Sequence, residues 1–505
     1  MELTKRTLAV LISASIIIAT TALVLVAVYD AGSIIPDVAD MGVTEWLEDF
    51  EAFHDFVEGN YPYLWLKNRT HGYNWLDLKQ MYADRITNAV DNEEFAGIIL
   101  DAVTALQNRH SYIIDPRQYA SYQSMYANLP APLNEIFTDD VVDAASYWET
   151  VFMNSIRQKY YSKYDAMMVY DRGNYVIEND GPWNDLYGED LKVVAVNGEP
   201  IDTAVTSCYE QDYLDWDFQR NKSFLWRISP RNFGTEAEFT IRNSTGSEIE
   251  MIFQTTHELS SSPYHYPTDI IDTQVWENES IAYLYVSIFL WDVIESHMAS
   301  FLDFYNQVDG YDYLIVDIRG NLGGNCRSWI DPIVRPLIKE TKVFEVYLAY
   351  RTDAYSDSFR EAFGITSIVP KESFSYLPPE AQGDEFRIYD YQHTFTPTHD
   401  INFSGEIILL VDNVVYSAAE GFTLFCKQTG FATIYGTASG GDGIMEFPTH
   451  YRLPNSRIVI NLSSALGLDR TGHANEEVRT QPDVYYESSF GNHSELIDFV
   501  LASIT

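Results

Sequence analysis

The chain has 505 residues, of which 74 are acidic and 32 are basic, so its formal net charge is -42. This balance argues against binding to nucleic acid or to an anionic membrane surface, because both require basic patches. The hydrophobic fraction of 46% is ample for packed cores, and the length suffices for roughly two to four domains of about 150 residues each.

The first pattern along the chain is an uncharged, mostly apolar run from Leu8 to Tyr29. As a helix this run would extend ~33 Å, enough to cross a bilayer core, and the Lys-Arg pair before it favours a cytoplasmic N-terminus. A cleaved signal peptide is the alternative, but its apolar core is usually only about 7–15 residues long. We therefore predict a membrane anchor or signal over residues 1–29, membrane contact through residues 8–29, a linker over residues 30–43, and a membrane-anchored or secreted protein whose catalytic part is extracytoplasmic.

Two further features bear on export. Asn-x-Ser/Thr triplets, which are acceptors for glycosylation in exported proteins, begin at Asn68, Asn221, Asn243, Asn278, Asn402, Asn461 and Asn492. The three cysteines allow at most one disulfide bridge, for which Cys326 and Cys426 are the more plausible pair, and free thiols are equally acceptable. No Cys/His spacing resembles a zinc site, so no metal is expected.

Helical patterns follow the linker. Apolar residues recur at helical spacing over residues 46–57, and further helices are predicted over residues 75–90 and 91–108, the last of them opened by the capping-box pattern Asp-Asn-Glu-Glu. His110 therefore lies just past a helix and outside its buried stripe.

Strand and turn signals dominate residues 165–260, where Asn197-Gly198 is a strong hairpin signal. From about residue 270 strands alternate with helices, which is typical of an α/β domain. The predicted strands cover residues 281–289, 313–316 and 407–411 and the region of Ile434, and the predicted helices cover residues 292–307 and 417–429. Residues 343–403 show no regular pattern and are predicted to be an irregular insertion.

Two short segments carry the chemistry. The predicted strand ending at Val316 runs into the glycine-rich loop Asp317-Ile-Arg-Gly-Asn-Leu-Gly-Gly324, and the strand over residues 407–411 leads to Ser417 at a helix start. The loop can offer backbone N–H groups and the serine a hydroxyl. Acyl transfer needs both, because the nucleophile creates an oxyanion that must be hydrogen-bonded as it forms. Asp317 and Arg319 are expected to pair and shape the loop. No Gly-x-Ser-x-Gly elbow is present, which argues against an α/β-hydrolase.

In order and content these motifs resemble those of the C-terminal-processing (tail-specific) serine proteases, and most of all the branch that contains the tricorn core protease and the chlamydial protease-like activity factor. The segments that carry the resemblance, besides the glycine-rich loop, are Tyr416-Ser-Ala-Ala-Glu420, Gly436-Thr-Ala-Ser-Gly440, Leu453-Pro-Asn455, Pro482-Asp483, Leu106-Gln-Asn-Arg-His-Ser111 and Gly188–Ile201. Each segment is a weak signal alone, and their joint order is a strong one.

The resemblance implies an α/β fold with a ClpP/crotonase-like catalytic domain over residues 270–505, an N-terminal helical cap domain over residues 44–125 and a β-rich PDZ-like domain over residues 165–260. The PDZ-like stretch can hold a peptide end as an added strand, or it is an inert spacer. In one branch of the family a lysine 25 residues after the serine is the base. Asp442 stands at that position here, so a Ser–Lys dyad is not expected.

The tricorn-like branch instead uses a histidine supported by a glutamate. The resemblance thus implies Ser417 as nucleophile, His110 as general base and Glu476 as the acid behind it, with Glu477 as the rival. Alternatives from the residues themselves remain open: Ser417 can be an ordinary helix cap, and His450 and His473 are competing bases. The backbone N–H groups of the oxyanion hole are expected from Gly323, Gly324 and Ala418.

The function that follows is a serine-type endopeptidase that is exported and membrane-anchored and acts on peptides or on unfolded protein tails, with no cofactor and no nucleic-acid partner. The alternative is a non-catalytic protein that binds peptides or ligands on the same fold, because fold does not fix function. A crotonase-type acyl-CoA enzyme is disfavoured, since it would be expected to offer basic contacts for phosphates. The distance between His110 and Ser417 in the folded chain discriminates the peptidase from the binding protein.

Overall fold

The computed structural model describes residues 37–164, 166–178, 191–259, 270–398, 400–444 and 447–504. The predicted membrane segment, residues 8–29, lies outside these ranges. Among the helices that the structure does describe, none combines the length and the apolar character needed to cross a bilayer. The cysteines Cys208, Cys326 and Cys426 are all free thiols.

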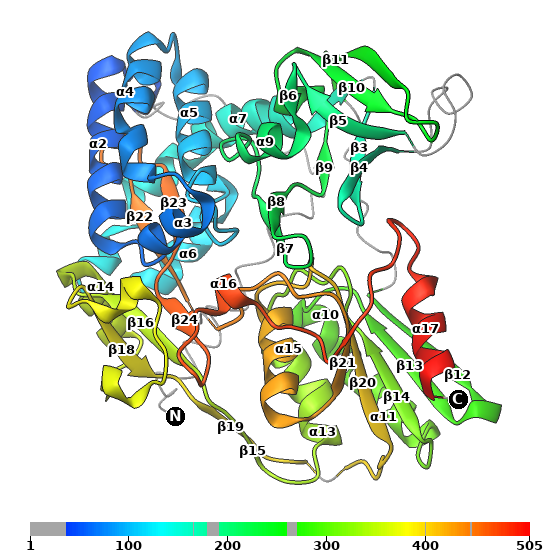
Figure 1. Cartoon of the computed structure of the whole chain (residues 1–505). Coiled ribbons are helices and arrows are strands. Elements are labelled where there is room, and N and C mark those ends of the chain that lie inside the picture. The colour runs from blue at the N-terminus through cyan, green and yellow to red at the C-terminus, as the bar shows by residue number, and fades with distance from the viewer. Residues whose placement is uncertain are drawn as a thin grey trace, which may run out of the picture.

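Helices make up the N-terminal part of the described chain (Figure 1). They are η1 (Asp37–Asp40), α2 (Val43–Asn60), α3 (Leu64–His71), η2 (Trp75–Leu78), α4 (Lys79–Asn88), α5 (Asn92–Thr104), η3 (Pro116–Gln118), α6 (Tyr119–Tyr126), η4 (Leu133–Glu135) and α7 (Asp139–Tyr161). The helices expected over residues 46–57, 75–90 and 91–108 are therefore present. Asp91 caps α5 by accepting hydrogen bonds from the backbone N–H groups of Glu93 and Glu94, which stabilises the helix start.

Residues 448–463, late in the chain, pack against these helices. The strands β22 (Pro448–Arg452) and β23 (Val459–Ser463) pair with β1 (Tyr112–Ile113) in an antiparallel sheet of order β1-β23-β22. Ile460 and Leu462 of β23 are buried in the same apolar cluster as Phe50 of α2. The core of the helical part is thus shared with residues more than 300 positions away in the sequence.

A β-rich part follows α7. Its main sheet has the order β2-β11-β10-β5-β4-β3-β9, with β6 on β5. The strands are β2 (Ser162–Tyr164), β3 (Met168–Asp171), β4 (Asn174–Ile177), β5 (Lys192–Val196), β6 (Glu199–Pro200), β9 (Arg227–Ile228), β10 (Glu236–Arg242) and β11 (Glu248–Leu259), accompanied by the hairpin β7 (Asp215–Asp217) and β8 (Lys222–Phe224), by α9 (Ile201–Thr206) and by η5 (Pro230–Asn232). The hairpin turn predicted at Asn197-Gly198 joins β5 to β6, with φ of 50° and 79°, as a two-residue turn of this kind requires.

The α/β part contains a six-stranded sheet of order β12-β13-β14-β20-β21-β25. Its strands are β12 (Ile271–Trp276), β13 (Ile281–Val286), β14 (Tyr313–Asp317), β20 (Glu406–Val411), β21 (Thr433–Gly436) and β25 (Val484–Tyr485), and from β13 onward all pairings are parallel. The helices are η6 (Glu277–Glu279), α10 (Trp291–Ser296), α11 (Met298–Gln307), α12 (Arg327–Trp329), η7 (Ile330–Val334), α13 (Arg335–Leu337), α15 (Ala418–Thr429), α16 (Asn475–Val478) and α17 (Ser494–Ile504). The alternation of strands and helices predicted from residue 270 onward is present.

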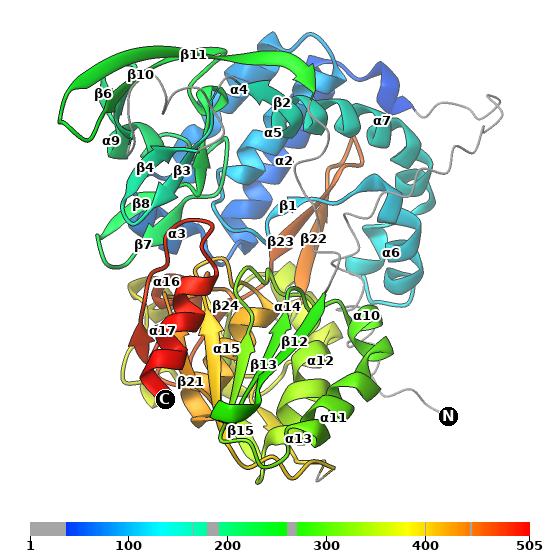
Figure 2. The ribbon, with the colours of Figure 1, turned by 90° about the vertical axis from the view of Figure 1, so that its right-hand side faces the viewer.

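Side chains that alternate along the strands separate the two faces of this sheet. Leu314 and Val316 of β14 point into the large core that also holds Phe304 of α11, whereas Ile315 between them packs with Leu496 of α17. Figure 2 shows α17 on one side of the sheet and α11 and α13 on the other. Since parallel strands end at one edge, the loops after β14 and β20 emerge side by side.

The prediction that residues 343–403 form an irregular insertion is wrong. They contain β16 (Tyr347–Arg351), β17 (Ile368–Val369), β18 (Phe386–Asp390) and β19 (His393–Phe395), together with α14 (Ala354–Ala362), η8 (Lys371–Ser373) and η9 (Pro379–Gln382); β19 pairs with β15 (Lys342–Phe344), and the order β17-β18-β16-β24 adds β24 (Leu466–Leu468) from far along the chain. Strands of two to five residues give too short an alternation to be recognised in sequence.

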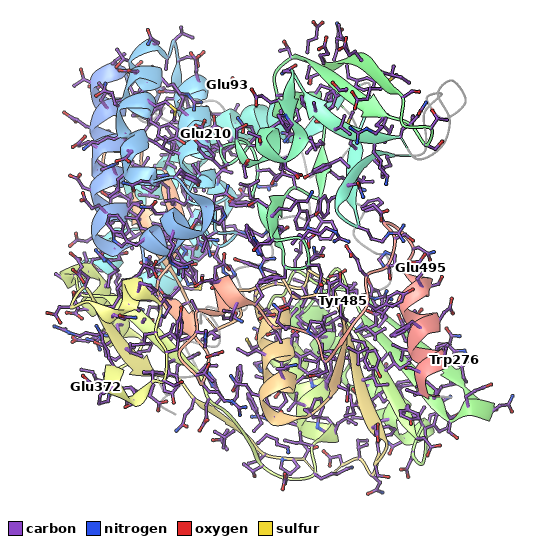
Figure 3. The ribbon with its side chains drawn as sticks, in the orientation of Figure 1. Glu93, Glu210, Trp276, Glu372, Tyr485 and Glu495 are labelled. Atoms are coloured by element: carbon purple, nitrogen blue, oxygen red, sulfur yellow. The ribbon has the colours of Figure 1, made fainter. Side chains whose placement is uncertain are left out.

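Acidic side chains are spread over the whole molecule. The glutamates labelled in Figure 3, Glu93, Glu210, Glu372 and Glu495, belong to the helical part, the β-rich part, the segment before β18 and α17. This distribution fits a solvated acidic surface rather than one concentrated patch.

We predict that Asp49→Ala weakens the junction between α2 and the 453–458 turn. The buried Asp49 carboxylate accepts hydrogen bonds from the backbone N–H groups of Asn455 (2.6 Å) and Ser456 (2.8 Å). Their loss should lower the free energy of unfolding by about 1–3 kcal/mol, measured as a lower melting temperature by calorimetry. The neighbouring Asp55→Ala, whose side chain is 66% exposed, is the control, and equal melting temperatures for the two variants would contradict the prediction.

Candidate active site

Ser417 lies in a sharp turn between β20 and α15. Its backbone adopts φ 57° and ψ -125°, and its side chain makes no capping hydrogen bond to the helix. The alternative that Ser417 is an ordinary helix cap is therefore not met. The turn is fixed from both sides. The Ser417 N–H donates to the carbonyl of Gly441 (3.3 Å), and a Cβ placed on Gly323 would come within 2.8 Å of the Ser417 Cβ. A glycine is needed at position 323 for the two loops to approach this closely.

His110 reaches the serine from the helical part. Its Nε2 lies 3.0 Å from Ser417 Oγ, and its Nδ1 lies 2.8 Å from Asp442 Oδ2. The backbone of His110 is held as well, since its N–H donates to Asn108 Oδ1 (3.0 Å) and its carbonyl accepts from Asn461 Nδ2 (2.6 Å). The structure therefore brings together the predicted serine and the predicted histidine at hydrogen-bond distance.

Asp442 is the carboxylate that stands behind the imidazole. Its side chain is fully buried and also accepts hydrogen bonds from Tyr63 Oη (2.5 Å) and Asn108 Nδ2 (2.8 Å). Burial opposes its ionisation, but the charge of His110 and the hydrogen bonds from His110, Tyr63 and Asn108 outweigh this effect and lower its pKa below the usual value. Asp442 is therefore an ionised acceptor.

Glu476 does not lie behind the His110 imidazole, where the family resemblance implied it. Its carboxylate pairs with Lys67 Nζ at 2.5 Å, and its second oxygen has no hydrogen-bond partner among the described residues. Burial, together with the neighbouring charge of Asp442, raises its pKa in spite of Lys67. Glu477 is engaged by Arg69 (2.7 Å). Neither glutamate contacts His110, because α16 is a single turn that directs both side chains toward α3.

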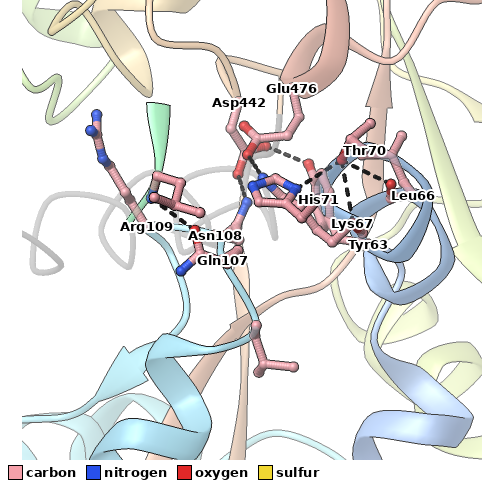
Figure 4. A network of polar contacts seen from close by, with 12 residues as sticks. Tyr63, Leu66, Lys67, Thr70, His71, Gln107, Asn108, Arg109, Asp442 and Glu476 are labelled. Carbon is pink, nitrogen blue, oxygen red and sulfur yellow. Dashed lines mark hydrogen bonds and ion pairs between the residues drawn. The ribbon is translucent and has the colours of Figure 1, made fainter. Parts of the chain in front are cut away.

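Figure 4 shows how the helical part builds the rear of this site. Tyr63, just before α3, bonds to Asp442, and Lys67 within α3 bonds to Glu476. Both contacts join positions that are about 400 residues apart in sequence. The partner of the histidine is thus selected by the packing of α3 on the α/β part.

The β-rich part also reaches the site. Asp215 of β7 is buried and pairs with Arg109, the residue before His110, at 2.6 Å, and with Arg479 at 3.4 Å. The Gln107 side chain donates to the carbonyls of Tyr209 (2.7 Å) and Asp212 (2.9 Å). Two residues just before His110 are therefore fastened to residues that precede β7 or lie in it.

The glycine-rich loop lies against the serine turn, but one of the proposed donors is occupied. The Gly323 N–H donates to Asn321 Oδ1 at 2.8 Å, so the expectation that Gly323 offers a free N–H is not met. Gly324 adopts φ 137°, and a Cβ there would lie 2.2 Å from the carbonyl of Phe289. No hydrogen bond from the N–H groups of Gly324 and Ala418 is recorded within the described residues. As predicted, Arg319 pairs with Asp317 (2.6 Å).

The competing histidines lie elsewhere. His450 is buried beside Tyr126, whose hydroxyl contacts its Nδ1, and burial lowers its pKa to about 3. His473 stacks on Tyr376 with ring centroids 4.1 Å apart. Neither ring contacts Ser417. Asn461, one of the glycosylation triplets, is fully buried, which removes it as an accessible acceptor in the folded chain.

Residues 280–486 match the family model described as peptidase family S41. The match covers less than half of the chain, and over these residues the chain is similar to peptidase family S41. The matched region contains Ser417, Asp442 and the glycine-rich loop, whereas His110 and Tyr63 lie before it. This match supports a serine peptidase.

Solved structures resemble the chain in fold. The chain is similar to mature CPAF complexed with lactacystin (TM-score 0.50, 11% identity, 92% of this chain and 97% of that chain) and to a CPAF mutant (TM-score 0.51, 13% identity, 91% and 96%). At such identities the likeness shows the fold alone. The tricorn protease matches 92% of this chain and 36% of its own length at 14% identity, and with its TM-score of 0.39 we base no argument on it. None of the curated proteins matches the chain in sequence.

Sequence reasoning missed Asp442 as the partner of the histidine, although one signal was present. An acidic residue flanked by glycines, Gly441-Asp442-Gly443, stands where part of the family has a catalytic lysine. The absence of a lysine there excludes a Ser–Lys dyad, and an aspartate at the same position is itself able to accept a hydrogen bond from a histidine.

A buried carboxyl in the first turn of α15 predicts a pH-dependent stability. Burial is the main cause that raises the pKa of Glu420 from 4.5 to about 7. Between these two pH values the Glu420 carboxyl keeps its proton in the folded chain and loses it in the unfolded chain. The free energy of unfolding should therefore fall by about 3 kcal/mol as the pH rises from about 4.5 to about 7. Glu420→Gln should flatten this part of the melting temperature profile, and an unchanged slope would contradict the assignment.

Proposed function

We propose that the chain is a serine endopeptidase that cleaves peptides or protein tails through an acyl-enzyme. The observation that carries the proposal is the line of contacts from Ser417 Oγ to His110 Nε2 (3.0 Å) and from His110 Nδ1 to Asp442 (2.8 Å). A serine hydroxyl is inert near neutral pH unless a base takes its proton. A non-catalytic binding protein would have no need for this geometry, and the distance therefore favours the peptidase.

The acid-base steps follow from the two ring nitrogens. Because Nδ1 faces the ionised Asp442, the neutral imidazole carries its proton on Nδ1 and presents Nε2 as acceptor to the Ser417 hydroxyl. His110 takes the serine proton as Oγ attacks the peptide carbonyl and later gives it to the leaving amine. Asp442 stabilises the imidazolium that exists between these steps. Water then hydrolyses the acyl-enzyme with His110 again as base.

The oxyanion is assigned to the N–H groups of Gly324 and Ala418. Ala418 is the first residue of α15, where the backbone N–H has no partner within the helix and the helix dipole favours negative charge. Gly324 follows the glycine that packs on Ser417. The Gly323 N–H would join this set only after it is released by Asn321. These steps require no metal or cofactor.

We propose for the three structural parts the roles that the family resemblance implies. The sheet of parallel strands supports the proposal of a ClpP/crotonase-like catalytic domain, and the helices that supply Tyr63 and His110 support that of a cap domain. The β-rich part is proposed to be a PDZ-like module that places a peptide end near Ser417, which its contacts with the His110 segment support. In place of the predicted Ser-His-Glu arrangement we propose Ser-His-Asp.

The proposed location is outside the cytoplasm, with a membrane anchor near the N-terminus. Its support is the apolar run of residues 8–29 and the basic pair that precedes it. An extracytoplasmic peptidase of this kind would meet exported or membrane-bound polypeptides as substrates.

We predict that Ser417→Ala and His110→Ala each reduce peptide hydrolysis by at least about 10⁴-fold, since nucleophile and base act as one unit. A serine-directed fluorophosphonate should label the wild type and leave Ser417→Ala unlabelled. Ser464→Ala, a buried serine away from this turn, is the matched control and should keep the label. Equal labelling of wild type and Ser417→Ala would remove Ser417 as nucleophile.

We further predict that Asp442→Asn lowers kcat by about 10³–10⁴-fold, because an amide holds the imidazole in the wrong tautomer. Glu476→Gln should lower kcat much less, since Glu476 contacts Lys67 and not His110. Steady-state kinetics on both variants decides whether Asp442 or Glu476 supports His110. The reverse ranking would return the supporting role to Glu476.

A further inference from the structure

We infer that Glu420 is a positioning residue that holds Asp442 against His110 through the side-chain amide of Asn475. The inference rests on the proposed function and extends it from the residues that react to one that aligns them. Glu420 contacts neither His110 nor the Ser417 hydroxyl among the contacts of the described residues, so it is not itself a catalytic group.

The need for such a residue comes from the backbone of Asp442. Its φ is +52°, in the left-handed region that non-glycine residues seldom adopt, and Gly441 before it has φ +94°. A residue in this conformation keeps it only where its surroundings fix it on both sides. The direction of the Asp442 carboxylate depends on those backbone contacts together with the hydrogen bonds that Tyr63, Asn108 and His110 make to its oxygens.

On the N-terminal side the turn is tied to the serine. The Gly440 N–H donates to the carbonyl of Val415 (2.6 Å), and the carbonyl of Gly441 accepts from the Ser417 N–H (3.3 Å). These two bonds place the loop of Asp442 beside the nucleophile, but they leave the residue after Asp442 to be fixed by something else.

On the C-terminal side the tie is a side chain. The Gly443 N–H donates to Asn475 Oδ1 at 2.8 Å. A carboxamide offers an acceptor at one end and a donor at the other, and a rotation of 180° exchanges them. Asn475 therefore serves Gly443 only while its orientation is enforced.

Glu420 enforces that orientation. Its Oε1 accepts from Asn475 Nδ2 at 2.6 Å, which turns the Asn475 oxygen toward Gly443, and it also accepts from Thr480 Oγ1 at 2.7 Å. Both Glu420 and Asn475 are buried, so water does not replace a lost contact. A Cβ on Gly443 would lie 2.6 Å from Glu420 Cγ, which shows how closely the two segments pack.

Only one carboxylate oxygen of Glu420 accepts the hydrogen bonds from Asn475 and Thr480. Both donors bond to Oε1, and Oε2 has no partner among the described residues. Glutamine presents the same oxygen in the same place, so Glu420→Gln preserves the contacts and Glu420→Ala abolishes them. A residue that exchanged protons with the substrate would fail equally in both variants.

The test compares kcat and KM for the wild type, Glu420→Ala, Glu420→Gln and Asn475→Ala. We expect kcat to fall by about 10²-fold in Glu420→Ala, as for a small misplacement of a catalytic group, with KM little changed. Asn475→Ala should show the same loss, the double variant should add nothing further, and Glu420→Gln should restore kcat to within a few-fold. Asp49→Ala, another buried carboxyl outside this site, should lower the melting temperature without lowering kcat.

A second readout needs no turnover. The Nδ1 proton of an imidazole that donates to a carboxylate gives a low-field proton NMR signal, which His110→Gln identifies by its loss. We expect the signal in the wild type and in Glu420→Gln, and its loss in Glu420→Ala, in Asn475→Ala and in Asp442→Asn. If Glu420→Ala does not fold, Asn475→Ala carries the comparison.

The two readouts separate the inference from the proposed function. A wild type that shows the signal and its expected losses but hydrolyses no peptide would refute the peptidase and uphold the alignment of Asp442 by Glu420. A folded Glu420→Ala that keeps both the signal and wild-type kcat would overturn the inference. So would a wild type without the signal, or a Glu420→Gln that is as inactive as Glu420→Ala.

Discussion

The hydrogen bond between His110 and Asp442 is the contact on which the site depends. A buried carboxylate is costly unless it is fully hydrogen-bonded, and Asp442 meets this condition with donors from His110, Tyr63 and Asn108. Those three donors come from the helical part, whereas Asp442 and Ser417 belong to the α/β part, as does Tyr416, whose hydroxyl also donates to Asp442 (3.3 Å). The buried Asp442 carboxylate needs these hydrogen bonds, and the three from the helical part hold that part against the α/β part at the proposed active site.

The same arrangement gives each part a share in aligning the histidine. The helical part supplies the ring, and the β-rich part holds Gln107 and Arg109, which both precede the histidine. The α/β part provides Ser417 and, through Asn475 and Glu420, the position of Asp442. Peptidase chemistry on this scaffold is therefore a property of the assembled parts, since the matched family region alone does not contain the histidine.

Local sequence patterns were sufficient to predict helices, turns and strands whose signal is carried by neighbouring residues. The helices around Phe50 and Ile99, the turn at Asn197 and the strands that end at Asp317 and Val411 were all readable, because periodic burial and turn chemistry act over a few positions. The sheet formed by residues 347–390 was not, since its strands are short and one partner, β24, follows more than seventy residues later. The prediction of the acid that contacts His110 was wrong for a related reason. Glu476 and Asp442 are both acidic, and the sequence does not say which of them faces the imidazole ring.

By itself the sequence determined the parallel α/β framework, the serine at a helix start and the glycines that allow a loop to approach it, because those features follow from strand periodicity and from the steric freedom of glycine. Only the tertiary structure decided that Asp442 rather than Glu476 supports His110, and that Asn321 occupies the Gly323 N–H. These choices depend on how α3 packs against α16 and on one left-handed residue held at both ends. Packing and backbone strain of that kind involve residues hundreds of positions apart, and no local pattern records them.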